Sequence, residues 1–381
     1  MKILFITELY PKANKGGEYI RNYGLYKLLE NSKHEVISIL GNKVLTEMPE
    51  IIDKEKTELF DFSCHYKYES LLKDVFLKFK KQPDLISLLD KICGTFKPDV
   101  VFWDYYYYGQ YISYFKKKGI PVVYGTHNVQ SRLTLQEPAK KLREKLARLI
   151  IFLFMRLHEL FYFKKADAII AVSTHDYNFY SKRFPSVKSY VIPNFLIEDD
   201  YSIPDVIKEG YIIMTGNFGA YQNKQGLKWF LDNVWHEDLL LKTKLVVAGR
   251  SSDVVFRELS MNNSYKNVEA VGGIEDMKPY IAKAKLSIVP LLHGSGTRLK
   301  CIESMALKTQ LISTSQGAEG IEHNGSILIA NNPESFKKMI MDVLENKLDK
   351  TQEAYNIFIS KYSLTSSTKM LNQIIDNLFV S

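Results

Sequence analysis

The chain has 381 residues, of which 46% are hydrophobic and 25% are charged, and its formal net charge is +8. This composition is typical of a globular protein and excludes low-complexity disorder, collagen and a small disulfide-stapled domain. At roughly 100–200 residues per domain, the length predicts two domains. The scattered cysteines Cys64, Cys93 and Cys301 lack metal-ligand spacing, so we interpret them as reduced, buried thiols.

The first half of the chain alternates short apolar segments with helical ones, and the opening segment 1–7 is too short for a signal peptide. Short apolar strands separated by helices predict a parallel sheet covered on both faces. The acidic, proline-containing stretch 198–205 predicts an interdomain linker, with Glu198, Asp199 and Asp200 in a solvated turn. Strands are expected at 2–7, 34–40, 99–103, 121–126, 167–172 and 189–192, with a helix at 18–31.

The same pattern restarts after the linker, which predicts a second domain of the same α/β class. Two doubly wound sheets joined in this way form a cleft, and ligands bind at the carboxyl ends of their strands. Strands are expected at 211–215, 243–248, 268–271, 286–290, 311–314 and 327–329, and helices at 224–234, 277–285, 298–307 and 333–345, followed by a terminal helical segment over 352–379 broken near Ser363.

Most of the positive charge lies in one segment, 140–165, which holds eight Lys and Arg residues against Glu144 and Glu159. The segment is also apolar at three- and four-residue steps, which predicts a long amphipathic helix. Two interpretations stay open. The apolar face packs in the domain core, or it lies in the plane of an anionic membrane. Nucleic acid is disfavoured because no nucleic-acid-binding motif is recognisable.

The segment 290–321 carries the most specific chemical signal. A strand ending at Pro290 is followed by a loop with Gly294 and Gly296, which feeds a helix. Glycines permit close backbone approach, and exposed amides at a helix start bind phosphate. Arg298 and Lys300 add positive charge there, and the Glu303 carboxylate can accept hydrogen bonds from a vicinal diol. We interpret the segment as a nucleotide site, and the alternative is a solvated helix with ordinary surface charges.

The run G-S-G-T-R-L-K-x-x-E-S-M-A at 294–306, followed by G-A-E-G-I at 317–321, resembles the donor-site signature of retaining GT-B glycosyltransferases, group 1 or family 4-like, which use nucleotide-sugars. Segments 16–17, 126–128, 191–194, 215–218 and 249–250 resemble further motifs of that family in the same order. The resemblance implies the GT-B fold, with two Rossmann-like domains facing across a cleft. It implies an acceptor domain at 1–198, a donor domain at 206–355 and a C-terminal helix, about 360–381, that packs back on the first domain.

Site residues follow from this resemblance. Asn217 and Asn223 stand where many members carry a diphosphate-binding Arg and Lys, and Ser295 stands where many carry a first glutamate. We therefore expect Arg298 and Lys300 to neutralise the leaving group, helped by Lys224. The expected donor-binding residues are Gly16, Gly17, Gly216, Asn217, Arg250, Gly294, Ser295, Gly296, Thr297 and Glu303. The expected catalytic residues are His127, Arg298 and Lys300, and the expected acceptor-binding residues are Asp104, Tyr105, Tyr106 and Asn128.

The implied reaction moves a sugar from a nucleoside diphosphate to a hydroxyl of a glycan or lipid-linked glycan, with retention and without a metal or cofactor. The aromatic run 103–108 either stacks on acceptor sugars or packs internally. We expect a cytoplasmic protein, peripheral on the inner face of the membrane, that works in capsule or lipopolysaccharide synthesis. The rivals are a non-catalytic nucleotide- or sugar-binding module and an epimerase or phosphorylase on the same architecture. An oxidoreductase is disfavoured because no G-x-G-x-x-G follows either domain's first strand.

Overall fold

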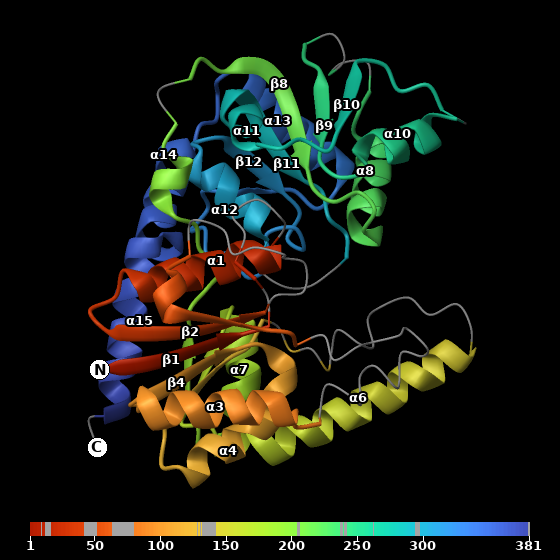
Figure 1. Ribbon diagram of the computed structural model, residues 1–381. Coiled ribbons are helices and arrows are strands. Elements are labelled where there is room, and N and C mark those ends of the chain that lie inside the picture. Colours follow the sequence, from red (N-terminus) through yellow and green to blue (C-terminus); the bar gives the residue numbers. More distant parts are fainter. Residues whose placement is uncertain are drawn as a thin grey trace. The chain divides into compact units, whose positions relative to one another are not determined.

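The computed structural model describes residues 1–8, 10–11, 17–41, 52–62, 80–127, 129, 131, 142–203, 206–236, 239, 242–261, 263–293 and 298–379. The chain divides into two compact units (Figure 1). The first contains Met1–Pro193 together with Thr368–Ser381, and the second contains Asn194–Ser367. The C-terminal helix therefore begins in the second unit and continues in the first.

The first unit is built on a parallel sheet whose seven described strands have the order β3-β2-β1-β4-β5-β6-β7. The strand order reverses between β1 and β4, and ligands of open parallel sheets bind at the carboxyl ends of strands at such a reversal. Thr7 and Asp104 are paired in the sheet at this edge. The strands are β1 (Lys2–Thr7), β2 (Glu35–Gly41), β3 (Thr57–Phe60), β4 (Val100–Asp104), β5 (Val122–Gly125), β6 (Ala168–Ala171) and β7 (Lys188–Val191).

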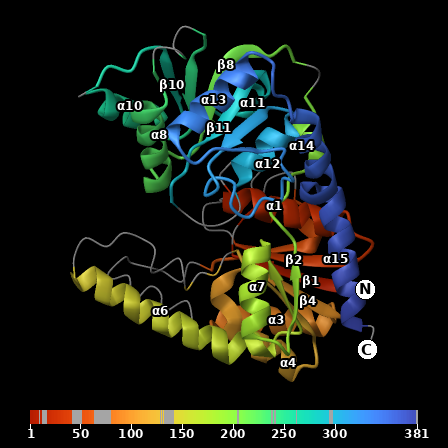
Figure 2. The same ribbon diagram turned by 180° about the vertical axis from the view of Figure 1, so that it is seen from behind.

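Helices cover both faces of this sheet. Leu85 and Leu89 of α3 (Pro83–Thr95) pack in one core cluster with Leu4 and Ile6 of β1. Helix α1 (Gly17–Glu30) lies on the opposite face from α3 (Figures 1 and 2). The remaining helices of this unit are α4 (Ile112–Lys117), α6 (Leu142–Tyr162), α7 (Thr174–Arg183) and most of α15 (Leu364–Phe379).

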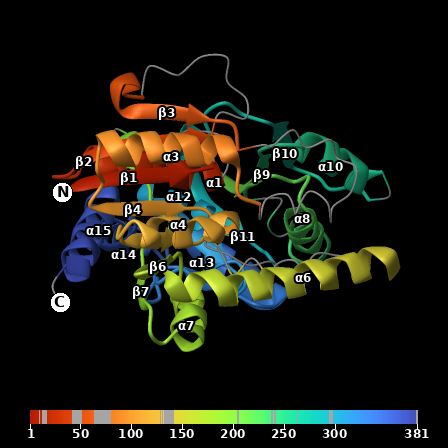
Figure 3. The ribbon, with the colours of Figure 1, turned by 60° about the horizontal axis from the view of Figure 1, so that its bottom comes forward.

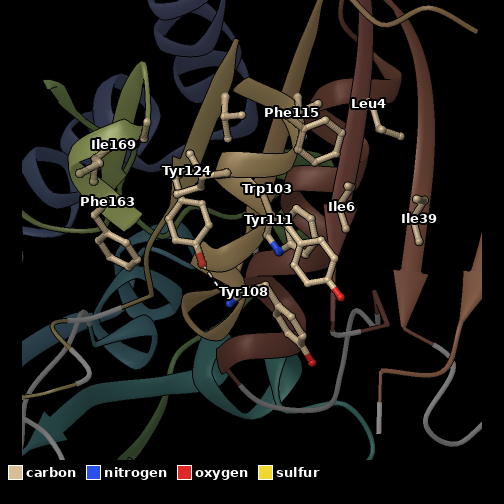
Figure 4. Close-up of a cluster of buried hydrophobic side chains, with 14 of the residues drawn as sticks. Leu4, Ile6, Ile39, Trp103, Tyr108, Tyr111, Phe115, Tyr124, Phe163 and Ile169 are labelled. Atoms are coloured by element: carbon tan, nitrogen blue, oxygen red, sulfur yellow. Dashed lines mark hydrogen bonds between the residues drawn. The ribbon is translucent and has the colours of Figure 1, made fainter. Parts of the chain in front are cut away.

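Two members of the aromatic run 103–108, Trp103 in β4 and Tyr108, lie in the core. Trp103 is 1% exposed, and its ring stacks on Tyr111 at 5.1 Å and on Tyr108 at 5.7 Å between centroids (Figure 4). Tyr124 Oη accepts a hydrogen bond from the Tyr108 amide at 3.2 Å. Internal packing, the alternative left open for this run, is thus the role of Trp103 and Tyr108.

The second unit repeats the plan with a parallel sheet of order β10-β9-β8-β11-β12-β13 among its described strands. The reversal lies between β8 and β11, so the loops after these strands meet at one edge. The strands are β8 (Glu209–Thr215), β9 (Leu245–Ala248), β10 (Val268–Gly272), β11 (Ala284–Val289), β12 (Gln310–Ser313) and β13 (Leu328–Ile329).

Two core clusters flank this sheet. Leu227 and Phe230 of α8 (Tyr221–Asn233) pack with Phe336 on one face, and Ile281 of α11 (Lys278–Lys283) packs with Ile213 on the other. The other helices are α10 (Ser252–Ser260), α12 (Leu299–Ala306), α13 (Pro333–Leu344) and α14 (Thr351–Ile357).

The sequence predictions agree closely with these elements. Strand β1 has the bounds that apolarity predicts, and the terminal helical segment is interrupted at Ser363, as expected. Strand β3 and helices α3, α4, α7 and α10 were not anticipated. Among the described residues no helix is long and apolar enough to cross a membrane.

The expectation of a solvated turn was wrong for Glu198. Its carboxylate accepts hydrogen bonds from the amides of Leu364 at 2.8 Å and Thr365 at 3.1 Å, and from the Thr365 hydroxyl. A carboxylate at this position satisfies amides that have no partner within the helix and favours the positive end of the helix dipole. Glu198 therefore caps the N-terminus of α15.

Replacing Glu198 by Ala should lower the free energy of unfolding by about 1–2 kcal/mol, because the α15 amides lose their cap. Hydrogen exchange measured by mass spectrometry or NMR should show faster exchange at Thr365, whereas the Leu364 amide keeps a second acceptor, the Leu196 carbonyl at 2.9 Å. The matched control is Asp199→Ala, since Asp199 is an exposed neighbour in the same turn. Unchanged protection of the Thr365 amide in Glu198→Ala would contradict the capping role.

Candidate functional site

In the first unit, His127 and Asp104 meet at the carboxyl edge of the sheet. Nε2 of His127 lies 2.6 Å from Oδ2 of Asp104, a side chain with no exposed surface. A nitrogen of Arg21, which is buried on α1, lies 3.6 Å from Oδ1 of the same carboxylate. The three side chains form a buried row in which the acid lies between the guanidinium and the imidazole.

Gly125 makes room for this row. It ends β5 and pairs with Asp104 in the sheet. A Cβ atom at Gly125 would lie 2.2 Å from Oδ1 of Asp104, which is far inside van der Waals contact. A larger residue at position 125 would therefore displace the carboxylate from His127.

The electrostatics keep Asp104 ionised. Burial acts to raise the pKa of Asp104, but His127 and Arg21 outweigh burial and hold the pKa below its ordinary value. Burial lowers the pKa of Arg21, and Asp104 opposes this change. An ionised Asp104 accepts a hydrogen bond from Nε2 of His127, which fixes the tautomer and the ring orientation. The ring of Tyr105 contacts the ring of His127 edge-on, with 5.4 Å between the ring centroids.

This burial changes the role expected for Asp104. The Asp104 side chain has 0% exposure and contacts His127 and Arg21, so we expect it to act through His127, and its direct contact with an acceptor stays a prediction. Gly17 begins α1, whereas Gly16, Asn128 and the side chain of Tyr106 lie outside the described residues.

In the second unit, Lys300 extends from α12 to the end of β8. Its Nζ donates to the Thr215 carbonyl at 2.7 Å and to Oδ1 of Asn223 at 2.9 Å. Nδ2 of Asn223 in turn donates to the Asn217 carbonyl at 2.8 Å. Asn223, one of the two asparagines where the family often carries a cation, thus holds the ammonium that Lys300 supplies.

Two glycines admit this arrangement. A Cβ at Gly216 would lie 2.9 Å from Nζ of Lys300. Gly249 follows β9 with φ of +127°, and a Cβ there would lie 2.1 Å from the Gly216 carbonyl oxygen. Residues with a side chain rarely adopt such a φ. Both the backbone conformation and the lack of space therefore require glycine at position 249.

Burial sets the charge of Lys300. It lowers the pKa of the ammonium to about 8, with a further lowering by Arg298 that is opposed by Cys301 and Glu303. Burial also lowers the pKa of Arg298, which precedes α12. Two cations with lowered pKa values at a helix start gain from a bound anion, because the anion restores the interactions that burial removes.

Glu303 lies one turn further along α12 and is held by Tyr201. The Tyr201 hydroxyl donates to Oε1 of Glu303 at 3.0 Å. Burial raises the pKa of Glu303, although Tyr201 and Lys300 act in the opposite direction. A carboxylate has about four acceptor positions, so Glu303 can accept from a diol while Tyr201 keeps its bond.

The expected donor-binding residues Asn217 and Arg250 form hydrogen bonds within the loops that follow β8 and β9. Oδ1 of Asn217 accepts from the Gly219 amide at 3.1 Å, and the Arg250 carbonyl accepts from the Phe218 amide at 2.8 Å. The help expected from Lys224 has no support, because its Nζ pairs with Glu258 at 2.6 Å on the surface. The glycine loop, Gly294, Ser295, Gly296 and Thr297, lies outside the described residues.

Sequence reasoning missed Arg21 and Tyr201, and it did not foresee the contact between Asn223 and Lys300. Arg21 stands in an apolar helical stretch, where a buried cation signals a buried acid. Tyr201 carries no comparable signal, because it lies 102 positions before Glu303 in the sequence and meets it only in the folded chain. Among the described residues no group of three or more His, Cys, Asp or Glu could hold a metal ion.

Comparisons with known proteins identify the family of the chain. Residues 23–199 match the family described as Glycosyltransferase Family 4, and residues 209–346 match the family described as Glycosyl transferases group 1. An uncharacterised 44.6 kDa protein in the cps region of Klebsiella pneumoniae is 28% identical over 173 residues. This match covers 43% of the chain, and the chain spans 44% of the length of that relative.

Solved structures share the fold over nearly the whole chain. Sucrose-phosphate synthase from Thermosynechococcus elongatus has a TM-score of 0.70 at 13% identity, with 99% of both chains covered. A glycosyltransferase from Rickettsia africae has a TM-score of 0.67 at 16% identity, covering 100% of this chain and 99% of that one. HepE from Anabaena, solved with UDP, has a TM-score of 0.61 at 13% identity, covering 99% and 100%.

Two parallel α/β sheets with these strand orders define a protein of the GT-B fold. The chain belongs to glycosyltransferase group 1, family 4. Enzymes of this family are retaining and metal-independent.

Replacing Asp104 by Asn should lower turnover by at least about tenfold, because the His127 ring loses the charge that orients it. The pH dependence of turnover should change as well, whereas donor KM should change little. Steady-state kinetics across pH measure both. The matched control is Asp99→Asn, since Asp99 precedes the same strand at the opposite edge. A drop in thermal stability with an unchanged pH profile would show that Asp104 is only structural.

Binding of a nucleoside diphosphate should weaken by about tenfold between pH 7.5 and 9.5, because Lys300, with a pKa of about 8, is deprotonated as pH rises through this value. Below pH 8 the ammonium is charged and binds the anion, and a bound anion raises its pKa. Calorimetric titration at several pH values measures the effect. Lys300→Ala should bind weakly with little pH dependence, and Lys224→Ala should behave as the wild type. Equal pH dependence in Lys300→Ala and the wild type would contradict this role.

Proposed function

We propose that this protein transfers a sugar from a nucleoside-diphosphate sugar to a hydroxyl of a glycan or lipid-linked glycan, with retention at the anomeric carbon. The observation that carries the proposal is the cluster at the start of α12. There the half-buried Lys300 ammonium, Arg298 and the Glu303 carboxylate follow the strand β11 at the reversal of the second sheet.

The donor is held by complementary charge. Arg298 and Lys300 bind the diphosphate, and Glu303 accepts hydrogen bonds from the ribose hydroxyls. As the sugar–phosphate bond breaks, negative charge grows on the leaving diphosphate. Cations that are already in place stabilise this charge without reorganisation, which is the largest contribution that such a site makes to rate.

The acceptor hydroxyl loses its proton to the leaving diphosphate on the same face of the sugar, so the reaction needs no protein nucleophile. His127 hydrogen-bonds the sugar or the acceptor and is oriented by Asp104. Proper positioning of the two reactants supplies the rest of the acceleration.

The acceptor class rests on the relative encoded in a capsule region, which suggests cell-surface polysaccharide synthesis. A structural neighbour was solved with UDP-glucose, which makes a uridine nucleotide the first donor to test. We further propose that the enzyme works at the cytoplasmic face of the membrane, where lipid-linked glycans are extended.

The decisive test is a panel of nucleotide-sugars, with release of nucleoside diphosphate measured in the presence of lipid-linked acceptors. One donor should give release that depends on acceptor, and NMR should show the donor's anomeric configuration in the product. Glu303→Ala should raise donor KM by at least about tenfold, because the ribose loses its carboxylate. His127→Ala should lower turnover by about a hundredfold.

Lys224→Ala is the matched control and should keep wild-type kinetics, because Lys224 is paired on the surface. Tight binding of nucleotide without release from any donor would favour a non-catalytic binding module. Release of a rearranged sugar without acceptor would favour an epimerase. An inverted product would contradict retention.

A further inference from the structure

Helix α6 (Leu142–Tyr162) packs on its own unit through one face only. Ile151 and Met155 join the core cluster of the first sheet, and His158 and Glu159 are also buried. The Leu142 end of the helix extends away from the sheet (Figures 1 and 3). The helix is therefore anchored by its second half.

The face opposite this anchor is apolar and exposed. At 100° per residue, the exposed large hydrophobic residues fall on one stripe, centred about 150° from Ile151. Each of these side chains is at least 36% exposed, and Leu142 is 83% exposed. The stripe consists of Leu142, Leu146, Leu149, Ile150, Leu153, Leu157, Leu160 and Phe161.

Such a stripe is unusual for a soluble surface, because large exposed hydrophobic side chains are normally scattered singly. Of the other exposed large hydrophobic residues among the described ones, none forms a comparable row along one helix. Of the two interpretations left open for this segment, packing in the domain core is therefore wrong for the stripe. A row of this kind marks an interaction surface.

The charges beside the stripe identify the partner. Arg143 and Lys145 are exposed and lie on opposite sides of the stripe, and Lys164 is exposed just beyond the helix. The acidic residues of α6 point elsewhere. Glu144 lies on the far side of the helix, and Glu159 is buried against Arg156 at 2.5 Å and Ser131 at 2.9 Å.

An anionic lipid surface fits this pattern. A helix with an apolar face bordered by Lys and Arg lies in the membrane plane, with its apolar face at the acyl boundary and its cations at the phosphates. A second copy fits less well, because two stripes packed together would bring the flanking cations of both copies close to one another.

We propose that the exposed stripe of α6 is a docking surface for an anionic membrane, on which the helix lies parallel to the bilayer plane. At 1.5 Å per residue its 21 residues span about 31 Å of the surface. The docking would place the first unit beside a lipid-linked acceptor. The docking to a membrane is inferred from α6 alone, whereas the position of the acceptor also rests on the proposed function.

Flotation with vesicles tests the proposal. The full chain should float with phosphatidylcholine vesicles that contain about one third phosphatidylglycerol, and float less at 0.5 M salt because salt screens the charges. Phosphatidylcholine alone should bind it at least tenfold more weakly. The triple variant Leu146→Glu, Leu153→Glu, Leu157→Glu should lose at least tenfold in binding, since it removes the apolar contact.

The control for the triple variant is Ile207→Glu, Met261→Glu, Ile359→Glu, which places the same charges on exposed apolar residues elsewhere and should float as the wild type does. Circular dichroism should show the same melting curve for both variants, because every substituted side chain is exposed.

The charge contribution has its own pair of variants. Arg143→Glu, Lys145→Glu should weaken binding to anionic vesicles at least tenfold and reduce its salt dependence. Lys117→Glu, Lys182→Glu, which changes two exposed lysines of the same unit, should have little effect.

Wild-type flotation of the Leu-to-Glu triple variant would overturn the proposal. So would a dimer in sedimentation velocity that this variant dissociates, because a second copy would then cover the stripe. Release of nucleoside diphosphate with a soluble acceptor should be equal in all these variants. A failure of docking with intact release, or the reverse, therefore separates this inference from the proposed transferase activity.

Discussion

The structure of the candidate site depends on one half-buried cation, the Lys300 ammonium. Removing an ammonium from water is unfavourable unless its hydrogen bonds are replaced. For Lys300 the replacements are the Thr215 carbonyl and the Asn223 amide oxygen, both neutral groups. Because both hydrogen-bond partners are neutral, and Cys301 and Glu303 only partly offset the effect of burial on the pKa of Lys300, the site favours a bound anion. The glycines at 216 and 249 are required by the same arrangement, since side chains there would occupy the space that the ammonium and the backbone use.

The first unit also removes a charged side chain from water at the carboxyl edge of its sheet, but this charge is negative. Asp104 is fully buried at the end of β4, next to the strand reversal, as Thr215 stands at the end of β8 in the second unit. Here, however, the buried charge is matched by Arg21 and His127. We propose that Asp104 orients His127, whereas Lys300 attracts an anionic ligand. One topology thus supports both roles.

Local patterns predicted the fold well because short apolar strands and regular helices leave clear periodicities. They also singled out Lys300 and Glu303 as candidate donor-site residues, since both belong to one continuous motif. They could not locate Tyr201, which reaches Glu303 only through tertiary folding, or the burial of Asp104, which depends on the absence of a side chain at Gly125. Helix α6 shows the same limit. Its periodicity predicted an apolar face, but only the fold decided which face would be buried.

Helix α15 has a further consequence. It starts at a cap formed by Glu198 and ends among the residues of the first unit, where Leu371, Ile374 and Ile375 are buried. A gene fragment that encodes only residues 1–193 would therefore leave apolar surface uncovered where this helix belongs. A separately supplied α15 peptide should cover that surface, so the protein offers a split-reporter design in which the C-terminal helix complements the first unit.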